Sequence, residues 1–154
     1  MKATPKQTTD AAEEAKEPKP RSLSRYLVTA VRILMGLAFV VFGLNGFLHF
    51  IPEPKAGIPE RAMEFSGALM KTGYMFPMIM GTQLLVGGLL LLNRFVPLAL
   101  ALLAPVVVNI VAFHLFLAPS GLVIAFVVLI LELYLAWAYR KAFCPMLAAR
   151  TTPN

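Results

Sequence analysis

Four long apolar runs dominate this chain and leave few choices for its fold. A helix needs roughly 20 mostly apolar residues to cross about 30 Å of hydrocarbon, and each run is long enough to do so. Composition agrees, since 58% of the residues are hydrophobic and 14% are charged, against about 25% charged in soluble domains. The runs extend from about Tyr26 to Phe50, from Tyr74 to Leu92, from Phe95 to Leu117 and from Leu122 to Tyr139.

The connections between the last three runs are very short. Asn93-Arg94 separates the second run from the third, and residues 118–121 (Ala-Pro-Ser-Gly) separate the third from the fourth. Connections of this length require neighbouring helices to run antiparallel. The sequence therefore predicts an all-α membrane protein, a four-transmembrane-helix antiparallel bundle.

The connection between the first two runs is longer and covers residues 51–73. Within it, Ala62, Phe65 and Leu69 recur at helical spacing, with charged residues between them. We expect a short amphipathic helix from Glu60 to Lys71 on the outer face of the membrane. Two roles fit this helix: a connector, which we prefer, and a lid over the mouth of the bundle.

Most lysines and arginines flank the runs on one side. With the N-terminus inside, the outer connections hold only Lys55, Arg61 and Lys71. The positive-inside rule then places both termini in the cytoplasm, and we expect integration into the bacterial cytoplasmic (inner) membrane. This topology accounts for the net charge of +6, so the basic residues do not indicate a nucleic-acid partner.

The predicted membrane domain covers residues 25–147. Residues 1–24 are rich in charge and proline and have almost no large apolar side chains, a composition typical of a disordered tail, here cytoplasmic. Residues 148–154 form a short C-terminal tail. Cys144 is the single cysteine, which excludes an intramolecular disulfide and dithiol chemistry.

Polar side chains inside the runs are the best functional signal, because each is costly in lipid without a partner or a purpose. A neutral group lies toward the predicted outer side and could bind a ligand or only join helices by hydrogen bonds. Within it, Asn45 and His49 are four residues apart and should share one helix face. We call this group the outer polar layer, and it comprises Asn45, His49, Gln83, Asn109 and His114.

Two charged side chains lie deeper, at matching depths above the cytoplasmic side. Arg32 is roughly 10 Å and Glu132 roughly 12 Å from the inner ends of their helices, at about 1.5 Å per residue. We expect them to form a buried ion pair between the first and fourth helices. The alternatives are that Arg32 extends to the interface and that Glu132 is a protonated acid in a proton relay.

No metal site is predicted, because no level of the bundle offers three or four nitrogen, sulfur or carboxylate ligands. His49 and His114 could in principle be the axial ligands of a b-type haem. We disfavour haem, since axial histidines usually have recognisable partners around them and these do not.

Several stretches, in their order along the chain, resemble the DoxX family of small four-helix membrane proteins. Arg32–Phe47 (RILMGLAFVVFGLNGF), Thr72-Gly-Tyr, Gly87–Leu92 (GGLLLL), Pro105–Phe116 (PVVVNIVAFHLF) and Glu132–Arg140 (ELYLAWAYR) carry the resemblance, which covers about residues 25–147. It implies the four-helix fold and a link to membrane oxidoreductase complexes, since the family is named for a subunit of a thiosulfate:quinone oxidoreductase. It implies no catalytic residues.

These features predict the membrane subunit of a quinone-linked redox complex. The outer polar layer would supply hydrogen bonds to a quinone, and Phe47, Phe113 and Phe116 could line its slot. Electron transfer would require a protein partner, and a homo-oligomer is a further option for assembly. The alternative is a non-enzymatic membrane scaffold or a carrier of a small molecule or lipid. The sequence does not identify the substrate or the partner.

Overall fold

The computed structural model describes residues 23–52 and 57–147. The C-terminal tail predicted for residues 148–154 lies outside the described residues. So does the predicted N-terminal tail, apart from Leu23 and Ser24, which begin the first helix.

The described part of the chain is helical and contains no strand. Most helix bounds lie within three residues of the predicted ones, and the amphipathic helix falls where it was predicted. The elements are α1 (Leu23–Leu48), α2 (Glu60–Lys71), α3 (Met75–Leu91), α4 (Val96–Phe116), η1 (Pro119–Gly121), α5 (Leu122–Ala138), α6 (Arg140–Phe143) and η2 (Cys144–Leu147).

Three helical segments are long and apolar enough to cross a membrane: α1, α4 and η1 with α5. Helix α3 has 17 residues and meets α2 at an angle of 91°. The bend lies at residues 72–74, where Gly73 has a φ of +76°. Membrane integration therefore rests on three spans, and α2 with α3 forms a bent pair beside them.

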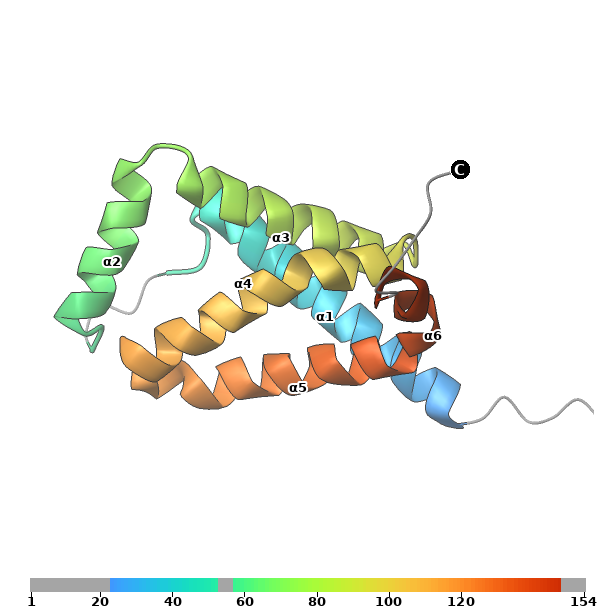
Figure 1. Cartoon of the computed structure of the whole chain (residues 1–154). Coiled ribbons are helices and arrows are strands. Elements are labelled where there is room, and N and C mark those ends of the chain that lie inside the picture. The colour runs from blue at the N-terminus through green and yellow to red at the C-terminus, as the bar shows by residue number, and fades with distance from the viewer. Residues whose placement is uncertain (1–22, 53–56, 148–154) are drawn as a thin grey trace, which may run out of the picture.

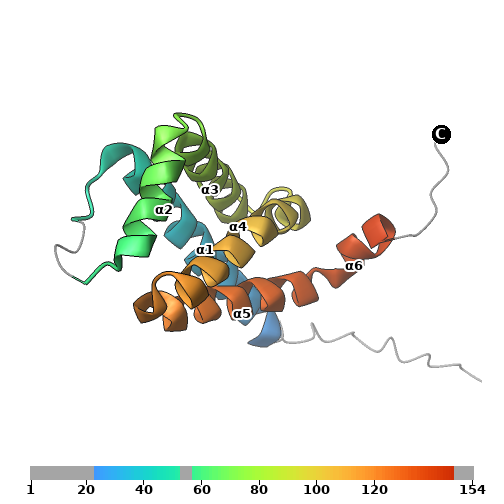
Figure 2. The ribbon, with the colours of Figure 1, turned by 60° about the vertical axis from the view of Figure 1, so that its left-hand side comes forward.

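The helices converge at one end and separate at the other (Figure 1). Toward the second end, α1 and α3 move away from α4 and α5, and α2 lies across the gap between the two pairs (Figures 1 and 2). We call this the α2 end. The opposite end, which holds the α3–α4 turn and α6, we call the α6 end.

Helices α1 and α3 pack along most of their length, because glycines let their backbones touch. A Cβ atom on Gly87 would lie 2.8 Å from the Val40 nitrogen and 2.9 Å from the Gly36 carbonyl oxygen. A side chain at position 87 would therefore push the two helices apart.

The core fills the α6 end. Leu90 of α3, Leu100 and Leu103 of α4 and Leu135 of α5 are each at most 2% exposed and belong to one cluster with α1. Burial of these large aliphatic side chains contributes to the stability of the fold. Because they fill the space between the helices at the α6 end, this end is closed, whereas the α2 end is open.

A candidate ligand-binding cavity at the α2 end

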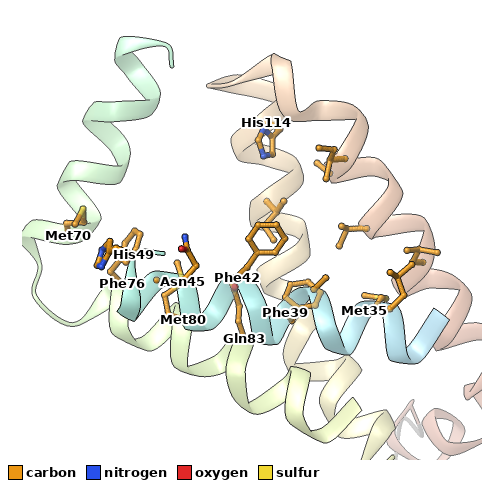
Figure 3. A pocket seen from close by; sticks show the side chains of 18 residues that line it. Met35, Phe39, Phe42, Asn45, His49, Met70, Phe76, Met80, Gln83 and His114 are labelled. Carbon is orange, nitrogen blue, oxygen red and sulfur yellow. The ribbon is translucent and has the colours of Figure 1, made fainter. Parts of the chain in front are cut away.

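A cavity of about 410 Å³ lies between the separated helix pairs and is lined by α1, α3, α4, α5 and Met70 of α2. Small-molecule sites typically have volumes of roughly 300–1,000 Å³ and mostly apolar walls with a few polar groups. The walls here fit that description (Figure 3).

The cavity opens sideways between α1 and α5. Leu34 and Phe42 of α1 and Ile124 of α5 line it, yet all three are exposed on the surface of the bundle. Since this surface belongs to apolar, membrane-length helices, a molecule dissolved in lipid could enter from the side.

Four of the five members of the outer polar layer line this cavity: Asn45, His49, Gln83 and His114. They come from α1, the residue just after it, α3 and α4 (Figure 3). The structure thus gathers most of a group that the sequence only placed at a similar depth.

Asn45 and His49 reach the cavity by a different geometry from the predicted shared helix face. Helix α1 ends at Leu48, and His49 adopts a left-handed conformation with a φ of +50°. The Ile51 N–H donates to the Asn45 side-chain oxygen at 2.6 Å, so this side chain fixes the turn after α1. Because its oxygen accepts this bond, the Asn45 NH₂ group remains as a donor.

Gln83 is the most informative of the four. Its side chain is only 7% exposed, it lines the cavity, and no hydrogen bond joins its amide to another described residue. Its amide atoms are not among the fully buried unpartnered atoms of the described residues, so they remain accessible, as expected for a group that faces the cavity. Buried polar groups nearly always have a partner, and an exception needs an explanation. A ligand in the cavity would supply the missing partner.

His114 is held at the end of α4 by a hydrogen bond between its Nδ1 and the Ala118 carbonyl oxygen at 2.9 Å. Its ring also contacts the Phe113 ring edge-on, with 5.3 Å between the ring centroids. The imidazole is half-buried and lines the cavity opposite α1 and α3 (Figure 3).

The prediction is wrong for Asn109. This side chain is exposed on the surface of α4 and does not line the cavity. Helix α4 is apolar on all sides, so its pattern could not indicate which face packs inward.

The predicted ion pair between Arg32 and Glu132 does not form. Both side chains are buried, but Arg32 donates through Nη1 to the Leu90 carbonyl oxygen and, at 3.4 Å, to that of Leu91. These carbonyls lie at the C-terminal end of α3, where the helix dipole favours a cation. Glu132 Oε1 has no hydrogen-bond partner in the described part of the chain.

A second cavity, of about 790 Å³, lies beneath α2. It is lined by α2, by the segment just before it and by the α4–α5 connection, and it shares Met70 and His114 with the first cavity. The tilted rings of Phe65 and Phe113, with centroids 5.9 Å apart, join α2 to α4 above it. Helix α2 thus covers the α2 end as well as connecting α1 to α3.

The aromatic residues that line the first cavity are Phe39, Phe42 and Phe76, which the sequence did not single out. Of those it did predict, Phe47 and Phe116 are exposed and absent from the lining, and Phe113 lines only the second cavity. Spacing from Asn45 would have found Phe42, which lies one helical turn before it.

No group of three or more His, Cys, Asp and Glu side chains that could hold a metal ion occurs among residues 23–52 and 57–147. Comparisons with protein-family models, curated proteins and solved structures found no match. The geometry of the cavity therefore carries the functional argument.

Proposed function

We propose that this chain is the membrane subunit of a quinone-linked redox complex and that the cavity at the α2 end holds the quinone. The observation that carries the proposal is Gln83, a side chain that is 7% exposed and whose amide faces a mostly apolar cavity with no hydrogen-bond partner among the described residues. A quinone supplies an apolar ring and carbonyl oxygens that accept hydrogen bonds from amide N–H groups.

The sideways opening supports a lipid-soluble ligand in particular. A quinone head could lie beside Gln83 and Asn45 while its hydrocarbon tail leaves between Phe42 and Ile124 into the bilayer. A water-soluble substrate would have no use for an exit lined by apolar, lipid-facing side chains.

The proposal includes the topology. We infer that α3 is a fourth span, because its 17 residues cover about 25 Å at about 1.5 Å per residue. Both termini would be cytoplasmic in a bacterial inner membrane, with the α2 end outside, as the positive-inside rule predicts. The resemblance to the DoxX family agrees with this assignment and remains a prediction.

The electrons would pass to or from a catalytic protein partner. The described residues offer a place to bind and orient a quinone, and Cys144 is an isolated, exposed thiol. The chain would thus contribute the ligand site and the membrane anchor of the complex.

The test is the quinone content of the protein purified in mild detergent, measured by chromatography of the organic extract. We expect near-stoichiometric quinone in the wild type and its loss in Gln83→Leu. Asn109→Leu is the matched control, because it also replaces an amide on an apolar helix, but outside the cavity. This control should retain the quinone.

A well-folded wild type that carries phospholipid and no quinone, even after quinone is added back, would contradict the proposal. That result would favour the second candidate, a non-enzymatic lipid carrier or scaffold, which the same sideways opening could serve. Equal quinone content in Gln83→Leu and the wild type would also contradict it, since the quinone would then lie elsewhere.

A further inference from the structure

The hydrogen bond of His114 determines which of its nitrogens carries a proton. A carbonyl oxygen can only accept, so Nδ1, 2.9 Å from the Ala118 oxygen, must be the donor. In the neutral imidazole the other nitrogen, Nε2, is then an acceptor. No hydrogen bond to Nε2 occurs within the described residues.

The imidazole of His114 packs against the α4–α5 connection, which leaves space for it at Gly121. A Cβ atom on Gly121 would overlap the Cε1 and Nδ1 atoms of His114 and would lie 2.9 Å from Nε2. Gly121 has a φ of −94°, which any residue can adopt, so glycine is required here for space and not for its backbone freedom.

The carbonyl that orients the ring is itself fixed. Ala118 is 7% exposed, and its oxygen also accepts the Gly121 N–H at 3.2 Å. The ring, the carbonyl and the glycine are therefore in mutual contact, and Nε2 is the remaining nitrogen of a residue that lines the first cavity and also the second.

From this geometry we propose that the cavity preferentially takes the reduced, hydroxyl-bearing quinol, with a quinol hydroxyl donating to His114 Nε2. The inference rests on the proposed function. The carbonyl oxygens of an oxidised quinone cannot donate to Nε2, whereas the hydroxyls of a quinol can. A bound quinone would leave Nε2 facing an acceptor, and that mismatch disfavours the oxidised form.

The test compares the dissociation constants of a short-chain benzoquinol and its oxidised benzoquinone for the protein in lipid nanodiscs, under anaerobic conditions. We expect the wild type to bind the quinol roughly tenfold more tightly, the ratio that one added hydrogen bond can give. His114→Leu should reduce this ratio to about one, because it removes the acceptor for the quinol hydroxyl and also the mismatch with the quinone oxygen. His114→Gln, which keeps an acceptor oxygen, should restore part of the ratio.

Gly121→Ala provides a second variant that leaves His114 in place. Displacement of the ring should lower the quinol preference as His114→Leu does. Gly81→Ala is its matched control, because a Cβ there meets nothing within 4 Å, and it should keep the wild-type ratio. Monodisperse chromatography and an unchanged unfolding temperature identify which variants are folded.

A wild type that binds both forms equally, or the quinone more tightly, would overturn the inference while leaving quinone binding intact. A quinol preference that survives in folded His114→Leu would overturn it as well. Failure of the wild type to bind either form would instead overturn the proposed function on which the inference rests.

Discussion

Two buried polar side chains, Arg32 at the α6 end and Gln83 at the α2 end, have different surroundings, and a third, Glu132, has no partner for its Oε1 among the described residues. At the α6 end, Arg32 donates to the carbonyl oxygens of Leu90 and Leu91 at the end of α3. At the α2 end, Gln83 is equally buried but has no partner among the described residues and faces a cavity.

The difference shows how a polar residue in an apolar helix can be interpreted. Arg32 and Gln83 are both costly in lipid, and the sequence alone gives no reason to assign them different roles. Once the structure shows the partners, Arg32 has a structural role, because it closes a helix end. For Gln83 we propose a binding role, because its amide has no partner among the described residues and lines the cavity.

The largest loss of stability should come from a change in the close backbone contact between α1 and α3. Gly87→Ala should lower the free energy of unfolding by about 3 kcal/mol, since a backbone-to-backbone contact cannot yield to the added methyl group. Gly88→Ala is the adjacent control, because its Cβ would meet open space. Thermal unfolding in detergent measures the stability of both variants, and equal losses of stability would show that α1 and α3 do not pack closely at Gly87.

A smaller loss should follow at the α6 end from Arg32→Met. We expect about 2 kcal/mol, because the variant removes hydrogen bonds and a cation from the end of α3. A double-mutant cycle with Glu132→Gln sharpens the comparison. Since the two side chains form no ion pair, the coupling energy should be under about 0.5 kcal/mol, and a coupling above about 1.5 kcal/mol would restore the predicted pair.

At the α2 end, the change in the free energy of unfolding should have the opposite sign. Gln83→Leu in ligand-free protein should raise the free energy of unfolding by up to about 1 kcal/mol, because it replaces an unpartnered buried amide with an apolar side chain. Added quinone should then stabilise the wild type but not the variant. A clear destabilisation of ligand-free Gln83→Leu would show that the amide has a structural partner after all.

The smallest effect belongs to the member of the outer polar layer that the structure excludes. Asn109→Leu should change stability by no more than about 0.5 kcal/mol and leave quinone binding unchanged, because the side chain is exposed on α4. Loss of binding in this variant would return Asn109 to the site. The same binding assay used for Gln83→Leu decides it.

The sequence predicted the helices well because their signals are local. Twenty-residue apolar runs define α1, α4 and α5, and the spacing of Ala62, Phe65 and Leu69 defines α2. The end of α1 was misplaced by two residues, since Asn45 stops the helix with a side-chain hydrogen bond that hydropathy does not reveal.

The site was predicted only in part because depth does not specify direction. Depth grouped Asn45, Gln83 and His114, which line one cavity, but it also included Asn109 and paired Arg32 with Glu132. The actual partners of Arg32 are backbone carbonyls. Because every residue has a backbone carbonyl, the sequence does not indicate which ones Arg32 contacts. Only the close crossing of α1 and α3 brings these particular carbonyls within reach.

The most direct test of the central claim, that the α2 end is built around a ligand, is labelling with a photoreactive quinone followed by peptide mapping. We expect crosslinks on the cavity walls, at Phe42 of α1 and at Ile124 or Val128 of α5, with labelling abolished by excess unlabelled quinone and absent in Gln83→Leu. Crosslinks confined to the exposed face of α4 around Asn109, or labelling that excess quinone does not reduce, would contradict it.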